Sequence, residues 1–493
     1  MSPGDSDALF EQLRALVGTR GPVQTARHPI TVAAIADWCD AMGDGNPLYV
    51  DEEAAAKSRH GGIVAPPATL DIWDRPGLPA QARFRPAGLP QADDPRSKAL
   101  RLLESAGFVG VVAVNSELEI ARYLRPGDLL QNTQILEDVS PEKKTALGIG
   151  HFVTTRQRYE TSDGEHVGDL LFRILKFKPG SGAAPAAADD SGKRPAPDAN
   201  PSLRPRPGIN RDNQALYDGY RAHELRLPRC NGCNRVFFPP SPRCSECGSF
   251  DIGYVVSSGR GSVYSYVVVH HPQVPGFRYP LVVALVELEA PGGAGQDGQG
   301  VRFVADMVGV TPAQVAVGMP VELQWLDTHP ALVDGATDSR GPISLPQFRP
   351  ATPTRREDTV AASAVSEGDR LPLWTLALSP THIVAGALAT RDFQDVHHDR
   401  DLAQQKGSKD IFLNINTSLG YLQRYVTDWS GPEAVVTALR VKLGAPAYPY
   451  LPLTFAGSVH SVDAASGRVV VGVQASNELG PHLTGTVELE LPQ

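Results

Sequence analysis

The stretch Thr390-Arg391-Asp392-Phe393-Gln394-Asp395-Val396-His397-His398-Asp399 places an acid and a base within five residues. It follows the apolar run 383–388, which we interpret as a strand. Beyond Gly407, apolar residues recur at spacings of three and four, which predicts a helix with one buried stripe: Ile411, Ile415, Leu419, Leu422 and Val426. A carboxylate and an imidazole beside a helix can orient and deprotonate a water molecule. Asp392 and His397 are therefore the candidate catalytic residues.

Length and charge limit the classes of protein. A chain of 493 residues should hold several domains, because single cores stop growing at roughly 250–300 residues. The net charge of −9 and the pI near 5.8 argue against a nucleic-acid-binding protein. No apolar run approaches the ~20 residues of a membrane span, and acidic residues stand near the N-terminus where a secretory signal is basic. We expect a cytoplasmic protein with no nucleic-acid or membrane partner.

Alternating apolar runs and turn residues divide the chain into three structured units and two linkers. Residues 1–178 show early helices and then four alternating runs, and residues 368–493 show the polar loop, a helix and four more runs. Residues 209–345 carry short runs typical of a barrel of about five strands. The segments 179–208 and 346–367 are interpreted as linkers. Helices followed by antiparallel strands define the α+β class, with one fold used twice.

Four of the five cysteines form two CxxC pairs within about residues 228–250: Cys230, Cys233, Cys244 and Cys247. In a reducing compartment this spacing indicates a metal rather than disulfides. Four thiolates make a closed tetrahedral site, so a structural zinc ion is expected, although iron or a ribbon without its metal fits the same spacing. The fifth, Cys39, has no base beside it and is interpreted as a half-buried thiol.

A second loop aligns with the first. Gly43-Asp44-Gly45-Asn46-Pro47-Leu48-Tyr49 corresponds residue by residue to Arg391-Asp392-Phe393-Gln394-Asp395-Val396-His397. Both resemble the motif, roughly G-D-x-N-P-L-H, of the MaoC-like (R)-specific enoyl-CoA hydratases, which have the hotdog fold. In that family the Asp and the His are catalytic, and the resemblance places them on Asp392 and His397. In the first unit Tyr49 takes the histidine position, and a neutral phenol is a poor base near pH 7.

The resemblance extends over nearly the whole chain apart from its linkers. The third unit is similar to the small catalytic subunit of the actinobacterial steroid side-chain enoyl-CoA hydratase over 383–399, 407–412 and 423–429. The first two units resemble its large subunit, a degenerate MaoC-like domain followed by a zinc-ribbon and OB-fold domain. The resemblance implies two hotdog domains flanking a zinc-ribbon and OB-fold β-barrel domain. It also implies that two subunits are fused in one polypeptide.

The resemblance further implies a substrate and a partner. The substrate is a coenzyme A thioester, implied to be a steroid-CoA with a three-carbon side chain and a 17(20) double bond. The partner is a thiolase-like aldolase docked on the zinc-ribbon and OB-fold unit, and a homodimer is expected by analogy. Donors for the developing enolate are expected at a helix N-terminus near Gly407 to Asp410. Prolines 66, 67 and 76 predict a short or absent central helix in 61–76, which favours a bulky substrate.

Two other function classes fit the sequence. One is an (R)-specific hydratase of straight-chain enoyl-CoA, which an assay with crotonyl-CoA distinguishes. The other is a non-catalytic OB-fold scaffold or single-strand binder, but stacking platforms need a basic groove and no dense basic cluster accompanies Arg260 and Arg278. Asp392 and His397 also have a simpler interpretation, as a helix-capping carboxylate and a loop histidine without chemistry.

Overall fold

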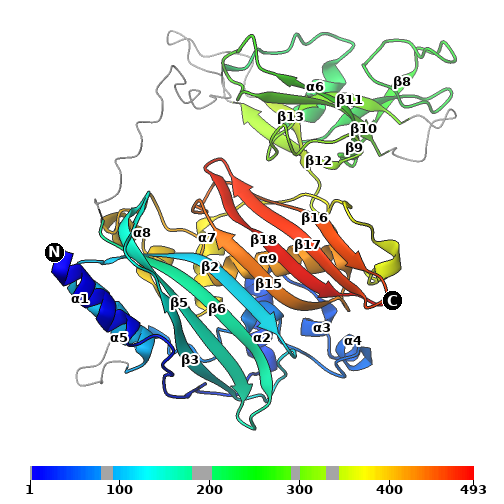
Figure 1. Cartoon of the computed structure of the whole chain (residues 1–493). Coiled ribbons are helices and arrows are strands. Elements are labelled where there is room, and N and C mark those ends of the chain that lie inside the picture. Colours follow the sequence, from blue (N-terminus) through cyan, green and yellow to red (C-terminus); the bar gives the residue numbers. More distant parts are fainter. Residues whose placement is uncertain (1–2, 79–92, 180–202, 290–299, 329–342) are drawn as a thin grey trace. The chain divides into compact units, whose positions relative to one another are not determined.

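The computed structural model of the chain describes residues 3–78, 93–179, 203–289, 300–328 and 343–493. The chain divides into two compact units (Figure 1). One contains Met1–Asp189, Pro353–Leu371 and Leu376–Gln493, and the other contains Asp190–Thr352 and Pro372–Thr375. The first and third units expected from the sequence therefore form one body. Most of the expected linker 179–208 lies outside the described residues.

The N-terminal half of the first body consists of helices followed by an antiparallel sheet. Its helices are α1 (Pro3–Arg14), α2 (Val32–Met42), α3 (Pro47–Val50), α4 (Glu52–Lys57) and α5 (Pro95–Ser105). Its strands are β1 (Gln24–Thr25), β2 (Gly110–Ile120), β3 (Leu130–Val139), β4 (Lys143–Thr145), β5 (Gly148–Thr161) and β6 (His166–Phe177). Within 61–76 the one helical segment is the 3₁₀ turn η1 (Pro67–Thr69). This confirms the short or absent central helix that the prolines predict.

The C-terminal half repeats this order around a longer helix. Its elements are η5 (Ala362–Ala364), α7 (Pro380–Ala389), η6 (Asp395–His397), α8 (Arg400–Gln405), α9 (Ile415–Ser430), β15 (Val435–Leu443), β16 (Leu453–Asp463), β17 (Arg468–Asn477) and β18 (Gly480–Glu490). The short strand β14 (Trp374–Leu376) spans the boundary at Leu376, where the chain returns to the first body. Most side chains of α9 are buried, including polar ones. No helix among the described residues has the length and apolar character needed to span a membrane.

Two expectations for this half are wrong. The run 383–388 lies in α7 and not in a strand, because Ser379 caps a helix there: its hydroxyl accepts a hydrogen bond from the His382 N–H, and Pro380 follows at the first helical position. A short apolar run alone does not distinguish a strand from a buried helix. The buried helix begins at Ile415 after the N-cap Asn414, and not near Gly407 to Asp410.

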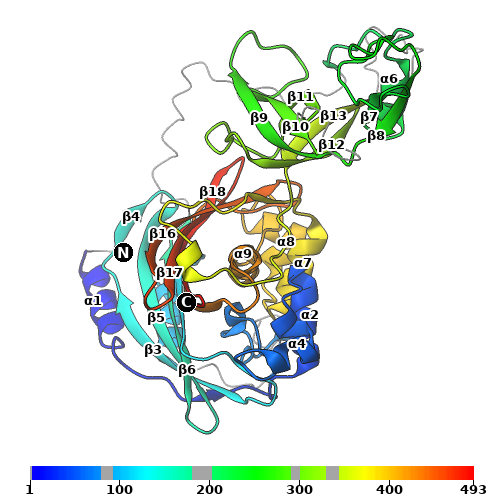
Figure 2. The ribbon, with the colours of Figure 1, turned by 90° about the vertical axis from the view of Figure 1, so that its right-hand side faces the viewer.

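A single sheet joins the two halves. Its strand order runs β1-β3-β5-β6-β2-β15-β18-β17-β16, and β2 pairs antiparallel with β15, with Leu118 opposite Leu439. The curved sheet has α9 and α2 on the same side (Figure 2). There α2 contacts α7, and both helices contact α9. The loops that follow α2 and α7 are therefore carried by two helices that pack against each other.

The second body is a small β domain. It contains α6 (Gln214–Arg221), a two-stranded sheet of β7 (Arg226–Cys230) and β8 (Ile252–Val256), and a five-stranded sheet in the order β11-β10-β9-β12-β13. These five strands are β9 (Arg260–Val269), β10 (Leu281–Leu288), β11 (Arg302–Asp306), β12 (Pro320–Thr328) and β13 (Ile343–Pro350). The expected number of strands is confirmed. Because β13 extends to Pro350, the loose segment begins later than the expected residue 346.

Candidate active site

Asp392 and His397 lie between α7 and α8, and their side chains approach each other. His397 Nε2 is 3.6 Å from Asp392 Oδ2, and the two side chains are 6% and 11% exposed. This separation is longer than a direct hydrogen bond. Two atoms at this separation can both accept a hydrogen bond of about 2.8 Å from one water molecule. The structure therefore brings the two candidate residues of the sequence analysis together.

The hydrogen bonding of His397 fixes which ring nitrogen carries the proton. Nδ1 lies 2.7 Å from the Phe412 carbonyl oxygen, which can only accept a hydrogen bond, so Nδ1 is the donor. Burial lowers the pKa of His397, against the opposing effect of Asp392. The neutral imidazole therefore presents the lone pair of Nε2 toward Asp392. This is the form that accepts a proton.

The loop is anchored to the buried helix by residues that the sequence did not reveal. Asn414 Nδ2 donates to the buried Thr390 hydroxyl at 2.8 Å, and that hydroxyl donates to the Gly386 carbonyl at 2.8 Å. Asn414 Oδ1 also accepts from the Thr417 N–H at 2.7 Å and so caps α9. An Asn directly before a helical apolar pattern is an N-cap signal, and it could have located this anchor. Asn414 fixes the loop relative to the start of α9.

The second loop holds an ion pair in place of an acid and a base. Asp44 Oδ1 accepts from Arg355 Nη2 at 2.6 Å, and Arg355 Nε donates to Asp428 Oδ1 at 2.6 Å. Burial raises the pKa of Asp44 to about 6, although the charge of Arg355 opposes this. Burial also raises the pKa of Tyr49 well above 10, so its phenol stays protonated. Arg355 belongs to the segment interpreted as a linker, 346–367.

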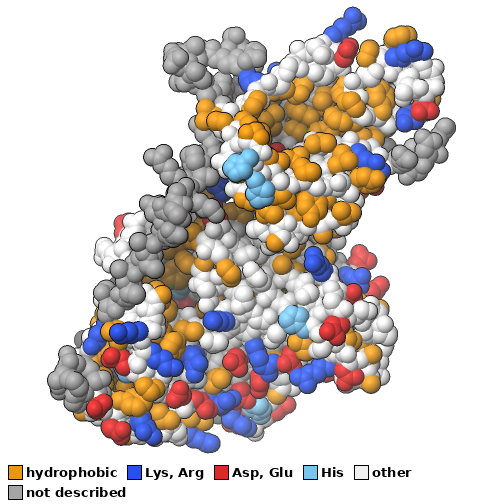
Figure 3. All heavy atoms as spheres, turned by 45° about the horizontal axis from the view of Figure 1, so that its top comes forward, with side chains coloured by type: hydrophobic (Ala, Val, Ile, Leu, Met, Phe, Trp, Pro, Cys, Tyr) orange, Lys and Arg blue, Asp and Glu red, His pale blue; other side chains and the backbone are white. Residues whose placement is uncertain are grey.

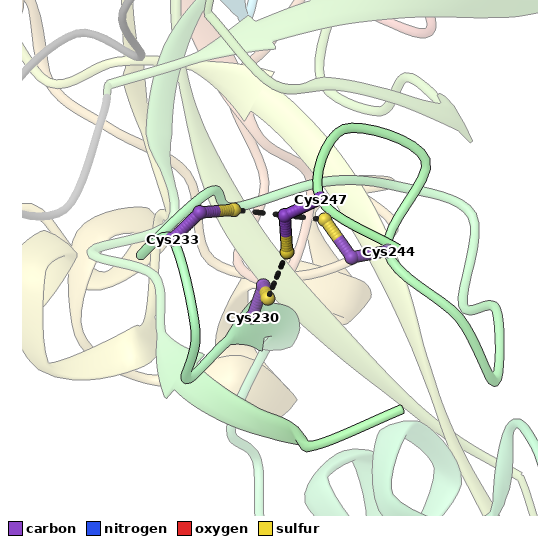
Figure 4. Close-up of side chains that lie close together, drawn as sticks. All are labelled: Cys230, Cys233, Cys244 and Cys247. Carbon is purple, nitrogen blue, oxygen red and sulfur yellow. Dashed lines mark hydrogen bonds between the residues drawn. The ribbon is translucent and has the colours of Figure 1, made fainter. Parts of the chain in front are cut away.

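The four cysteines converge at one point of the second body (Figure 4). Their Sγ atoms all lie within 4.8 Å of one another; those of Cys230 and Cys247 are 3.5 Å apart, and those of Cys233 and Cys244 are 3.7 Å apart. A tetrahedral zinc ion with Zn–S bonds of about 2.3 Å requires sulfurs about 3.8 Å apart. A backbone N–H of Cys233 lowers the pKa of Cys230, and a backbone N–H of Cys247 lowers that of Cys244. The pKa of Cys233 is raised to about 12, where the backbone N–H of Arg235 is outweighed by burial and by the neighbouring thiols. The donor set fits zinc.

Cys39 is not a nucleophile. Its side chain is buried, and burial raises the pKa of the thiol, with Asp44 and Asp40 adding to the effect. A thiol in such surroundings stays protonated and inert. The expected half-buried thiol is in fact fully buried, because Cys39 lies on the inner side of α2, where it is 2% exposed.

Three family models match the chain. Residues 15–170 match the FAS1-like dehydratase domain region. Residues 218–253 match the ChsH2 rubredoxin-like zinc ribbon domain, and residues 254–326 match the ChsH2 C-terminal OB-fold domain. A solved MaoC-like dehydratase covers 97% of this chain and 99% of its own, with a TM-score of 0.50 and 17% identity, so it shares the fold. The protein therefore belongs to the class of MaoC-like enzymes with the hotdog fold, here combined with a zinc ribbon domain and an OB-fold domain.

Relatives identify the family within this class. The chain is 38% identical over 344 residues to the probable enoyl-CoA hydratase alpha subunit of Thermomonospora curvata, which covers 70% of this chain and 97% of the relative. In Mycobacterium tuberculosis the alpha subunit of 3-oxo-4,17-pregnadiene-20-carboxyl-CoA hydratase is 41% identical over 64% of this chain and 94% of its own length. The beta subunit is 53% identical over 25% and 95%. The chain belongs to the MaoC-like enoyl-CoA hydratase family, with alpha-subunit-like and beta-subunit-like regions in one polypeptide.

A further solved structure is similar in sequence to part of the chain. The solved structure named "Ltp2-ChsH2(DUF35) aldolase" is 41% identical in sequence, covers 30% of this chain and 100% of its own, and has a TM-score of 0.24. The name pairs the ChsH2 domain with an aldolase.

Proposed function

We propose that the chain hydrates a steroid 2-enoyl-CoA and that Asp392 and His397 carry the chemistry. The observation that supports this most strongly is their geometry: a carboxylate oxygen and an unprotonated Nε2 stand 3.6 Å apart, both nearly buried. Two acceptors at this separation bind the two hydrogens of one water molecule. The water is then oriented and made more nucleophilic.

The proposed reaction is an addition of water that requires no redox step. The oxygen of the held water bonds to the β-carbon while His397 Nε2 takes one of its protons, and the π electrons of the double bond move through the α-carbon to the thioester oxygen. The enolate then collapses, and the α-carbon receives the proton from the imidazolium. One water molecule is added in total, and the enzyme returns to its starting protonation state. Asp392 holds the second water hydrogen and stabilises the imidazolium.

The developing enolate needs a positive electrostatic environment. Helix α9 begins immediately after its N-cap Asn414. The side chain of Asn414 also donates to the Thr390 hydroxyl and so fixes the loop that carries Asp392 and His397. The N-terminus of α9 offers the positive end of a 16-residue helix dipole close to the loop. We assign the stabilisation of the enolate to the first turn of α9.

We assign the first hotdog half a non-catalytic role. In its loop, residues 43–49, Tyr49 stands in place of the histidine, and Arg355 donates a hydrogen bond to the carboxylate of Asp44. The half also lacks a long helix within 61–76, which favours a large acyl group in the paired domains. The relatives from Mycobacterium tuberculosis are named for a pregnadiene-carboxyl-CoA, and we infer that this chain acts on a steroid thioester of the same kind.

The test of this function compares two substrates. The full chain, incubated with 3-oxo-4,17-pregnadiene-20-carboxyl-CoA or with crotonyl-CoA, is expected to hydrate the steroid thioester with a kcat/KM at least about tenfold higher, because the steroid buries more apolar surface. Mass spectrometry of the hydrated thioester measures both rates. Equal or faster turnover of crotonyl-CoA would instead support the straight-chain (R)-specific hydratase.

We also infer that the second body docks a thiolase-like aldolase. Its matches to the ChsH2 zinc ribbon and OB-fold models support this, and hydrophobic side chains gather over its surface in Figure 3. Four exposed or half-buried side chains form an apolar patch on the outer face of β9, β10 and β11, where Val267 pairs with Val283 and Leu285 pairs with Val304. Val267 and Val304 are 58% and 57% exposed. Exposed apolar patches of this kind mark protein contacts.

A charge placed in the apolar patch tests the docking. Val267→Glu is expected to weaken capture of the purified thiolase-like aldolase by at least about tenfold, because the carboxylate would be buried without a partner. Val317→Glu, at a valine 67% exposed outside the patch, is the matched control and should bind as the wild type does. Hydratase turnover should be unchanged in both variants. Equal capture by Val267→Glu and wild type would contradict the assignment of this face.

A further inference from the structure

A closed ring of hydrogen bonds joins the first hotdog half to the start of α9. Arg75 Nη2 donates to Asp71 Oδ2 at 2.8 Å and to Asn416 Oδ1 at 2.7 Å. Asn416 Nδ2 donates in turn to Asp71 Oδ1 at 2.6 Å, and Arg75 Nε donates to the Asp71 carbonyl at 3.0 Å. Each of the three side chains is thus held by the other two. The guanidinium of Arg75 has a fixed position at the first turn of α9.

The same segment of the first half lies against the catalytic loop. A Cβ at Gly77 would stand 3.2 Å from Arg391 Nη2 and 3.7 Å from the ring of Phe393, the two neighbours of Asp392. Gly77 has φ +77, so a side chain there would be strained as well as crowded. The segment 71–77 therefore packs directly onto the loop that carries the proposed acid.

The charge of Arg75 acts on both proposed catalytic groups. The pKa of Arg75 is raised: burial disfavours the cation, but the carboxylates of Asp71 and Asp392 outweigh that effect. The pKa of His397 is lowered chiefly by burial, and the cation of Arg75 contributes in the same direction. Arg75 is attracted to the acid and disfavours protonation of the base.

We propose that Arg75, supplied by the non-catalytic half, is a positioning residue for hydration in the catalytic half. Held by Asp71 and Asn416 beside the loop that carries Asp392, its guanidinium sets a fixed positive charge that acts on the Asp392 carboxylate and on the His397 imidazole. This inference rests on the proposed function of Asp392 and His397. It explains why the first half retains a partly buried cation that acts on a site whose proposed reacting groups all come from the other half.

The inference predicts the direction of a pH effect. The groups that face His397 are Asp392, His398, the Phe412 carbonyl and Arg75, and Asp71 and Tyr159 act on Arg75 in turn. Of these, Asp392 and the Phe412 carbonyl raise the pKa of His397, whereas His398 and Arg75 lower it. Removing the cation therefore raises the pKa of His397. The acidic limb of the kcat/KM profile should move to higher pH.

Three variants of the full chain test the role of Arg75. Arg75→Gln is expected to lower kcat about 10- to 100-fold, since small displacements of catalytic groups have effects of this size, and to move the acidic limb to higher pH. Arg75→Lys, which keeps the charge, should restore the position of the limb. Arg122→Gln is the matched control, because Arg122 also pairs with carboxylates of the first half, at 2.8 Å from Asp128 and 2.6 Å from Glu165. It should leave the pH profile unchanged.

A measurement that does not depend on turnover separates this inference from the proposed function. Titration of the His397 imidazole by NMR, assigned with His397→Ala, should give a higher pKa in Arg75→Gln than in the wild type. An unchanged pKa, or a kcat loss equal to that of Arg122→Gln with no shift of the limb, overturns the role of Arg75. A wild-type chain that hydrates no enoyl-CoA overturns the proposed function instead, and the titration still decides the effect of Arg75 on His397.

Discussion

Asp392→Asn and His397→Ala are each expected to lower kcat for steroid enoyl-CoA hydration by about 10²- to 10⁴-fold, the range for loss of a general acid or base. Asn keeps the shape of Asp392 but loses the negative charge that holds the water and stabilises the imidazolium. Ala removes the group that takes the proton. The hydrogen bonds of Thr390 and Asn414 hold this loop in place, and neither substitution removes them, so the fold should persist.

The measurement is single-substrate kinetics together with thermal unfolding of each variant. Asp44→Asn is the matched control, because it makes the same change at the aligned position of the other loop. It should retain wild-type kcat. Near wild-type turnover in Asp392→Asn would remove Asp392 from the mechanism, and an equal loss in Asp44→Asn would show that both loops serve the reaction.

Arg355→Met is expected to lower the free energy of unfolding by about 3–5 kcal/mol near pH 7, as is found when one partner of a buried ion pair is removed. The side chain of Asp44 is fully buried, and Arg355 lies between it and Asp428. Asp428 keeps a second cation, since Arg424 Nε lies 3.4 Å from its other oxygen. The cost therefore falls mainly on Asp44.

The loss should depend on pH in a defined direction. The pKa of Asp44 is about 6 in the protein against an ordinary value near 3.8, so its ionisation opposes folding as pH rises between these values. Arg355 lowers this pKa, and without it Asp44 remains protonated to higher pH. Arg355→Met should thus cost less at pH 5, where Asp44 is neutral, than at pH 8.

Urea unfolding at the two pH values measures this effect. Arg156→Met, which breaks a half-exposed pair with Glu137, is the control and should cost only about 0–1 kcal/mol at both. Adding Asp44→Asn to Arg355→Met should recover much of the lost stability, since no buried charge is then left alone. An equal loss at pH 5 and pH 8 would mean that Arg355 acts through packing and not through its charge.

Sequence patterns predicted the features that local chemistry fixes. The spacing of three and four in α9, the alternation of the strands, the two CxxC pairs and the Asp392 to His397 interval each depend on residues close in the chain. The run 383–388 lies in the helix α7 and not in the expected strand, because Ser379 and Pro380 in front of it signal a helix start. Local patterns were sufficient where both partners lay within a few residues.

The contacts between the halves had no such signal. Arg75 meets Asn416 across 341 positions, and Arg355 meets Asp44 across 311. Each Arg stands in a segment that is rich in proline and turns, where a charged side chain is usually solvated. Only the fold shows that these two cations are enclosed, so a single sequence could not have identified either residue.

The ladder between β2 and β15 pairs two hotdog halves that belong to one polypeptide, and this fixes their ratio. Where the two hotdogs are separate chains, their pairing is a bimolecular equilibrium that dilution weakens and in which like halves can compete. Within one polypeptide each half meets its partner at an effective concentration that a linker sets on the order of millimolar, whatever the amount of protein. The fused chain therefore guarantees one N-terminal hotdog half for every C-terminal half, even at low abundance.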